Sequence, residues 1–261
     1  MDTNTILEIR DVSIHFGKSI ALNDVSFQIT KGHIHGLIGP NGAGKTSVLN
    51  CISGIYHPSK GDIIFKGGDI THLKPYVRQK LGIGRTFQNV EIFAGMTVLD
   101  CLMFGRHLHS KYNILSAGLF KGWAEREEIK NRRVVEEIVD FLEIENIRDA
   151  IARSLPYGLQ KRVSLGIALA LSPEILLLDE PMAGLNLEER EDMVRFIVDI
   201  NEEKEMTILI VEHDMGVVMD ISHNITVLNF GNKICEGKPE VVQSDPAVIK
   251  AYLGGDSFTH N

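Results

Sequence analysis

The sequence has few cysteines, few aromatic residues and no long hydrophobic run among its 261 residues. Its three cysteines, Cys51, Cys101 and Cys235, lie far apart and match neither a metal-ligand spacing nor a disulfide framework, so we expect reduced thiols. No apolar stretch approaches the roughly 18 residues that a membrane-spanning helix needs. Residues 1–10 are charged and contain no apolar segment of signal-peptide length. A disulfide framework, a secretory signal and a membrane span are therefore not expected.

Positive charge is also scarce. The 27 Lys and Arg residues are outnumbered by 35 Asp and Glu residues, which gives a formal net charge of −8. Nucleic-acid-binding proteins usually carry excess basic charge, because phosphate neutralisation supplies most of their affinity. We therefore expect no nucleic-acid partner. The 44% of hydrophobic residues is ordinary for a globular protein, and the length allows a sizeable core.

The pattern of apolar residues predicts an α/β protein. Short, continuously apolar strands such as 175–179 are typical of a parallel sheet covered on both faces. Residues 6–16 and 21–29 instead read as antiparallel strands joined by a tight turn at Gly17-Lys18. Further strands are predicted at 33–38, 61–65, 83–87, 206–211, 224–228 and 233–236, the last two joined across Gly231-Asn232. Helices are predicted at 45–52, 97–107, 124–142, 159–171, 188–203 and 246–253.

We expect a single domain over residues 1–261. Residues 1–96 and 159–261 would form the α/β core with an N-terminal antiparallel β-subdomain, and residues 97–158 an inserted helical subdomain. Residues 109–123, which hold the single Trp, are predicted to be irregular. Residues 254–261 are predicted to be a loose tail.

A glycine-rich motif between the predicted strand 33–38 and the predicted helix 45–52 fits the pattern G-x-x-x-x-G-K-[ST], the Walker A motif. Glycines let successive backbone N–H groups converge on phosphate oxygens, and the helix directs its positive N-terminus at the same anion. Lys45 would bind the β- and γ-phosphates, and the Thr46 hydroxyl would bind Mg²⁺. The expected nucleotide-binding residues are Gly39, Pro40, Asn41, Gly42, Ala43, Gly44, Lys45, Thr46 and Ser47.

A second motif, the Walker B segment at residues 175–180, ends an apolar strand in two carboxylates. Ligands of open α/β sheets bind at the carboxyl ends of the strands, so Asp179 is placed to hold Mg²⁺ through water. The next residue, Glu180, is then free to act as general base on the attacking water.

With further elements in the same order, these motifs resemble the nucleotide-binding subunit of ABC transporters over residues 7–253. The resemblance implies a P-loop NTPase core, with ATP and Mg²⁺ as cofactors. It identifies Gln88 as a Mg²⁺ ligand and γ-phosphate sensor. It also places His213 where it would contact the γ-phosphate and order Glu180 and the water. Phe16 lies where the family stacks an aromatic ring on adenine.

Residues 155–160 occupy the position of the family signature L-S-G-G-Q, which contacts the γ-phosphate bound to the opposite subunit. Pro156 replaces the serine, so a hydroxyl and an N–H are lost, whereas the backbone donors at Gly158 and the helix start remain. Asn186 replaces the usual aspartate of the D-loop and would hydrogen-bond across a dimer. The expected signature residues are Leu155, Pro156, Tyr157, Gly158, Leu159 and Gln160.

Several segments resemble the ATPases of branched-chain amino acid importers: residues 84–88, 97–142 and 237–253, and the Tyr157 variant of the signature. The resemblance implies a second ATPase subunit, identical or related, and transmembrane permease subunits as partners. A substrate-binding protein would be an indirect partner, and the chain would lie peripherally on the cytoplasmic face of the membrane. The ATPase of a urea or short-amide importer, a soluble ABC ATPase and a P-loop kinase remain alternatives.

Overall fold

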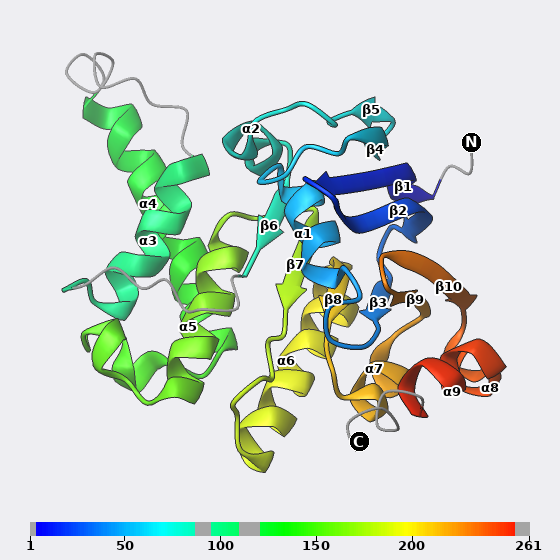
Figure 1. The fold of residues 1–261 in the computed structure, drawn as a ribbon. Helices are drawn as coiled ribbons and strands as arrows, with labels where there is room; N and C mark the ends of the chain where they lie inside the picture. Colours follow the sequence, from blue (N-terminus) through cyan, green and yellow to red (C-terminus); the bar gives the residue numbers. More distant parts are fainter. Residues whose placement is uncertain (1–3, 87–94, 110–120, 254–261) are drawn as a thin grey trace.

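The computed structural model describes residues 4–86, 95–109 and 121–253, which form two sheets with helices packed around them (Figure 1). The strands are β1 (Thr5–Phe16), β2 (Ser19–Thr30), β3 (Ile34–Ile38), β4 (Lys60–Phe65), β5 (Gly68–Asp69), β6 (Ile83–Arg85), β7 (Ile175–Asp179), β8 (Thr207–Val211), β9 (Asn224–Asn229) and β10 (Asn232–Gly237). The helices are α1 (Lys45–Ser53), α2 (Pro75–Lys80), α3 (Val98–His109), α4 (Lys121–Phe141), α5 (Tyr157–Ala170), α6 (Leu187–Lys204), α7 (Met215–Ile221), α8 (Pro239–Ser244) and α9 (Pro246–Leu253), with 3-10 turns η1 (Glu145–Ile147) and η2 (Ala152–Ser154). No helix of these ranges is long and apolar enough to cross a bilayer.

The N-terminal sheet has the order β2-β1-β4-β5 and is antiparallel. Strands β1 and β2 pair from Thr5 opposite Thr30 to Phe16 opposite Ser19, and this confirms the predicted antiparallel pair. Bulges in the pairing with β2 interrupt the strict alternation of β1. The β1 residues that are buried in the core include Leu7, Ile9, Val12 and Ile14.

The central sheet has the order β10-β9-β3-β8-β7-β6, in which every pair is parallel except β9 with β10. Strand β7 is buried on both faces. Ile175 and Leu177 pack in the cluster that joins the N-terminal sheet and α1, while Leu176 and Leu178 pack in a second cluster with α6. The predicted α/β architecture, with a mostly parallel sheet and an antiparallel β-subdomain, is confirmed.

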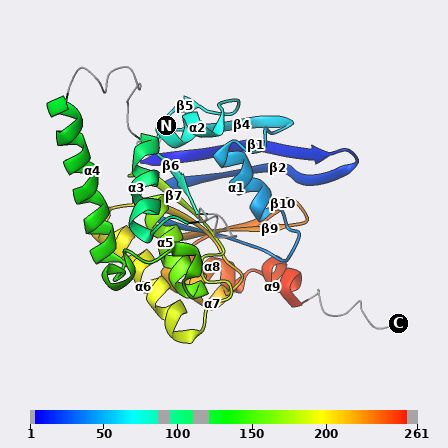
Figure 2. The ribbon, with the colours of Figure 1, turned by 90° about the vertical axis from the view of Figure 1, so that its left-hand side faces the viewer.

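Helices α3, α4 and α5 pack together on one side of the molecule (Figures 1 and 2). Cys101 of α3, Val139 of α4 and Val163 of α5 belong to the same buried cluster as Leu176 of β7. The helical segment therefore shares its core with the central sheet.

Three predicted boundaries were wrong by a few residues. Helix α5 begins at Tyr157 rather than at residue 159, because Pro156 takes the extended N-cap conformation and the helix starts directly after it. Helix α4 begins at Lys121 and includes Trp123, so the segment predicted to be irregular ends earlier than residue 123. The first turn was not predicted because it contains Gly122, a poor helix former. The β9–β10 turn is Phe230-Gly231, both with positive φ, as a type I′ turn requires.

The sequence patterns also missed α2, α7 and α8, which are too short for helical periodicity to show. Helices α2 and α8 begin with Pro75 and Pro239, and α7 is capped by the Asp214 carboxylate. Residues 110–120 and the predicted tail lie outside the described residues.

Arg78 of α2 holds the carboxyl end of α1, the helix that follows the glycine-rich loop. Its guanidinium is fully buried and donates to the carbonyl oxygens of Cys51, Ile52, Thr71 and Leu73. Burial lowers its pKa. Without Arg78, the carbonyl oxygens of Ile52 and Leu73 would lose their hydrogen-bond donor, whereas the Cys51 carbonyl also accepts from the Gly54 N–H at 3.1 Å.

We therefore expect Arg78→Leu to lower the free energy of unfolding by at least about 3 kcal/mol, because each orphaned buried acceptor costs about 1–3 kcal/mol. Urea denaturation followed by circular dichroism measures the change. The control is Arg148→Leu, which breaks a partly exposed ion pair with Glu136 and should change stability by much less. Equal losses in both variants would contradict the role of Arg78.

Candidate nucleotide-binding site

The glycine-rich loop connects β3 to α1 in a conformation that other residues cannot adopt. Gly39 has φ 152°, and a Cβ there would lie 2.1 Å from the Leu228 carbonyl oxygen. Gly44, the N-cap of α1, has φ 105°, and its Cβ would lie 2.7 Å from the Ala21 carbonyl oxygen. One side of the loop therefore packs closely against β2 and the end of β9, and only glycine fits at these two positions. The other side of the loop faces a cavity.

This cavity has a volume of about 220 Å³. Lys45 is only 5% exposed, and its Nζ donates to the carbonyl oxygens of Gly39 and Pro40 at 2.7 and 3.1 Å. Burial lowers its pKa, and the nearby carboxylates of Glu180 and Asp179 oppose that change. The lining residues are Ala21, Asn41, Gly42, Ala43, Gly44, Lys45, Thr46, Ser47, Glu180 and His213.

Asp179 ends β7 and is 2% exposed. Its Oδ2 accepts from Nη2 of Arg85 at 2.9 Å, whereas its Oδ1 is buried without a hydrogen-bond partner. An unpartnered carboxylate oxygen fits Mg²⁺, which prefers a few protein oxygens together with nucleotide phosphates. The Thr46 hydroxyl belongs to a residue of α1 that lines the cavity. Among the described residues, no three His, Cys, Asp or Glu side chains form a metal-binding group of their own.

Glu180 and His213 meet at the cavity wall. Nε2 of His213 contacts Oε1 of Glu180, although the two residues follow different strands, β7 and β8. Glu180 has φ 49°, and its N–H donates to the Val211 carbonyl at 2.9 Å. Parallel pairing of β7 with β8 therefore places the carboxylate beside the imidazole.

Some residues that were also predicted to bind the nucleotide or Mg²⁺ are not among the described residues that line this cavity: Gly39, Pro40, Phe16 and Asp179. Phe16 is 50% exposed at the end of β1, and its ring packs edge-on against Tyr56 with centroids 5.1 Å apart, outside the lining residues. The β2 residue Ala21 lines the wall instead. Gln88 lies outside the described residues.

The signature segment surrounds the N-terminus of α5. Pro156 is the N-cap, and Nε2 of Gln160 donates to the Leu155 carbonyl at 2.7 Å. The 45%-exposed Tyr157 packs on the loop at Gly184: a Cβ on that glycine would lie 2.9 Å from the ring. Among the described residues that line the cavity, none comes from this segment.

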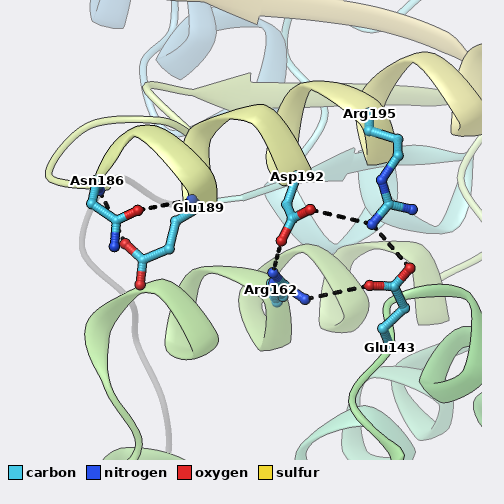
Figure 3. A network of polar contacts seen from close by, with 6 residues as sticks. All are labelled: Glu143, Arg162, Asn186, Glu189, Asp192 and Arg195. Carbon is cyan, nitrogen blue, oxygen red and sulfur yellow. Dashed lines mark hydrogen bonds and ion pairs between the residues drawn. The ribbon is translucent and has the colours of Figure 1, made fainter.

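Asn186 caps α6 within its own chain. Its Oδ1 accepts from the Glu189 N–H at 2.9 Å, and the Glu189 carboxylate accepts from the Asn186 N–H at 3.0 Å (Figure 3). Farther along α6, Asp192 contacts Arg162 of α5, and Arg195 donates to Glu143 at 2.9 Å. The Asp192–Arg162 pair connects α6 to α5, the helix that begins in the signature segment, and the Arg195–Glu143 pair connects α6 to the segment after α4.

A model of the ABC transporter family matches residues 22–183, which contain the loop, the signature segment and the two carboxylates. The chain belongs to the ABC transporter family. A model of the branched-chain amino acid ATP-binding cassette transporter also matches residues 232–257. The predicted membership is confirmed.

Curated ABC relatives are similar over almost the whole chain. BraF of Pseudomonas aeruginosa, a high-affinity branched-chain amino acid transport ATP-binding protein, is 40% identical over 95% of this chain and 98% of its own. LivG of Escherichia coli, described in the same terms, is 37% identical over 95% and 98%. The ADP conformation of an ABC transporter cassette superposes with a TM-score of 0.81 at 32% identity, covering 96% of this chain and 99% of that one.

Three polar residues of this ABC subunit contact the predicted site and were missed from the sequence. Arg85 binds Asp179 and donates to Asn50 of α1 at 2.8 Å. Lys161 of α5 donates to the Glu180 carbonyl at 3.0 Å, and Glu212 lies directly before His213. A charged residue inside or directly after a buried strand, as at Arg85 and Glu212, was the available signal.

Proposed function

We propose that this ABC subunit hydrolyses ATP to power a membrane importer of branched-chain or other hydrophobic amino acids. One observation carries the proposal: the cavity brings Lys45 and Thr46 of the loop together with Glu180 and His213. A phosphate-binding loop facing a carboxylate–imidazole pair has the parts that hydrolysis of a bound triphosphate needs.

Each side chain has a distinct task. Lys45 would leave the Gly39 carbonyl and bind the β- and γ-phosphates, aided by the N–H groups at the start of α1. Glu180 would accept a proton from the attacking water while His213 holds its carboxylate and contacts the γ-phosphate. Bound Mg²⁺ would neutralise phosphate charge, held by Thr46, Asp179 and Gln88.

We further propose that two cassettes enclose each ATP. Among the described residues, none from the signature segment lines the cavity of the same chain. The signature residues are therefore available to a γ-phosphate bound by a second copy of the chain or by a related paralogue. The remaining proposed partners are permease subunits in the membrane and, through them, a substrate-binding protein. The chain would then work at the cytoplasmic face. Phe16 is proposed to stack on adenine after turning from Tyr56.

The amino-acid importer is favoured over a urea or short-amide importer by two findings: the C-terminal match at residues 232–257 and the names of the curated relatives. Deleting this subunit in its host should abolish energy-dependent uptake of radiolabelled leucine and leave urea uptake unchanged. Loss of urea uptake with normal leucine uptake would reverse the assignment.

Specific ATPase activity should rise with protein concentration in the dilute range, because each site needs the signature of another chain. Steady-state hydrolysis measured alongside analytical ultracentrifugation tests this. A constant specific activity at concentrations where the protein is monomeric would indicate a self-contained site, as in a P-loop kinase.

A further inference from the structure

Glu212 is a buried carboxylate that the hydrolysis described above does not use. It follows the last residue of β8 and is 4% exposed. Its Oε1 accepts from the Met182 N–H at 2.7 Å, and its Oε2 accepts from the His213 N–H at 3.2 Å. Among the described residues, no lysine or arginine pairs with it.

A carboxylate in this position is costly for the fold. Burial raises the pKa of Glu212, and the nearby Glu180 carboxylate adds to that rise, while the two backbone N–H groups oppose it. A small apolar or hydroxyl residue after β8 would avoid the desolvation cost. A glutamate at position 212 is therefore better explained by its two hydrogen bonds, from the N–H groups of Met182 and His213, than by a contribution to the stability of the core.

The two donors lie on either side of Glu180. Met182 is two residues beyond Glu180 on the loop after β7, and the imidazole of His213 contacts the Glu180 carboxylate. The contacts close a ring that runs from Glu180 through Met182, Glu212 and His213 back to Glu180. Because Glu180 has a positive φ of 49°, its conformation persists only where the surrounding contacts fix it.

We infer that Glu212 is a positioning residue for hydrolysis: it fixes the backbone of His213 and of the loop after Glu180, so that the imidazole holds the Glu180 carboxylate toward the attacking water. The inference rests on the proposed ATPase function. Glu212 acts on the chemical step through His213 and has no contact with the cavity itself.

Glu212→Gln tests this with little change in size. The amide nitrogen would face a backbone N–H, so one of the two contacts becomes repulsive. We expect kcat to fall about 10- to 100-fold, as for a catalytic group displaced by about 1 Å. The KM for ATP and the equilibrium affinity for ATP should stay within about 2-fold. Glu212→Asp, which keeps the charge but shortens the reach, should recover part of the rate.

Asp245→Asn is the control for the loss of a carboxylate charge away from the cavity; Oδ1 of Asp245 accepts from the N–H groups of Ala247 and Val248 at 2.7 and 3.3 Å. It should leave kcat unchanged. Unfolding curves of all variants show whether a rate loss reflects unfolding. A folded Glu212→Gln variant with the wild-type kcat would overturn the inference, as would ATP affinity that falls in parallel with kcat.

A double-mutant cycle with His213→Ala gives the second test. In the His213→Ala background, Glu212→Gln should lower kcat by less than about 3-fold, because the group it positions is gone. Fully multiplicative losses would show that Glu212 does not act through His213. If the wild-type protein itself fails to hydrolyse ATP, the proposed function has failed, which is a different result from an active wild type with an unaffected Glu212→Gln variant.

Discussion

Glu180→Gln is expected to lower ATP turnover by about 10²- to 10⁴-fold, the usual contribution of a general base. The substitution keeps the size of the side chain and one acceptor oxygen for His213 but removes the charge that takes the proton from water. The positive φ of Glu180 and its N–H bond to Val211 involve the backbone and are kept. ATP binding should therefore stay close to wild type.

Because ATP would persist in the shared sites, the variant should also accumulate as a closed dimer in Mg-ATP. Turnover measured alongside gel filtration with and without ATP tests both statements. Glu203→Gln, an exposed change on α6, is the control. His213→Ala should give a related loss of turnover. Near-wild-type turnover of Glu180→Gln would refute the general base. An inactive variant that never dimerises would leave the base in place and point to a different partner chain.

Lys45→Ala should weaken ATP binding by about 100-fold. Among the described residues that line the cavity, Lys45 is the one lysine or arginine, and charge-assisted hydrogen bonds contribute about 1.5–3 kcal/mol each. In the structure the ammonium already lies in the loop, held by the Gly39 and Pro40 carbonyls. It therefore needs to move little to reach a phosphate.

Isothermal titration calorimetry with ATP measures this loss. Lys66→Ala removes an exposed lysine that pairs with Glu174 and does not line the cavity, and it should leave ATP affinity unchanged. Thermal unfolding in the absence of nucleotide should be compared for both variants, since Lys45 also bonds two carbonyls. Unchanged ATP affinity in a folded Lys45→Ala protein would refute the phosphate-loop assignment.

Much of the site was predictable because its parts are local. The loop at residues 39–46 lies between a strand and a helix that hydropathy alone marks, and its glycines are required by backbone conformations at Gly39 and Gly44. The Walker B segment forms a buried strand, β7. Its run of four apolar residues followed by Asp179 was enough to predict the strand from the sequence. Short helices such as α2 were not predicted, because six residues are too few to show a helical periodicity of apolar side chains.

Contacts between distant segments were not predictable in the same way. Nothing in the sequence near Asp179 indicates that Arg85 occupies one of its oxygens and leaves the other without a partner. The side-chain oxygen of Asn186 caps α6 within the chain, and its hydrogen bond across a dimer stays a prediction. The contact of Phe16 with Tyr56 was not indicated by the sequence either, and the stacking of Phe16 on adenine stays a prediction.

The sequence by itself determined the α/β architecture, the loop and its helix, and the strand that carries Asp179 and Glu180, because these depend on hydropathy period and backbone conformation within a few residues. Only the tertiary structure decided which side chains meet across strands. Parallel pairing of β7 with β8 brings Glu180 to His213 and Glu212 to Met182, since residues far apart in sequence become neighbours at one sheet edge.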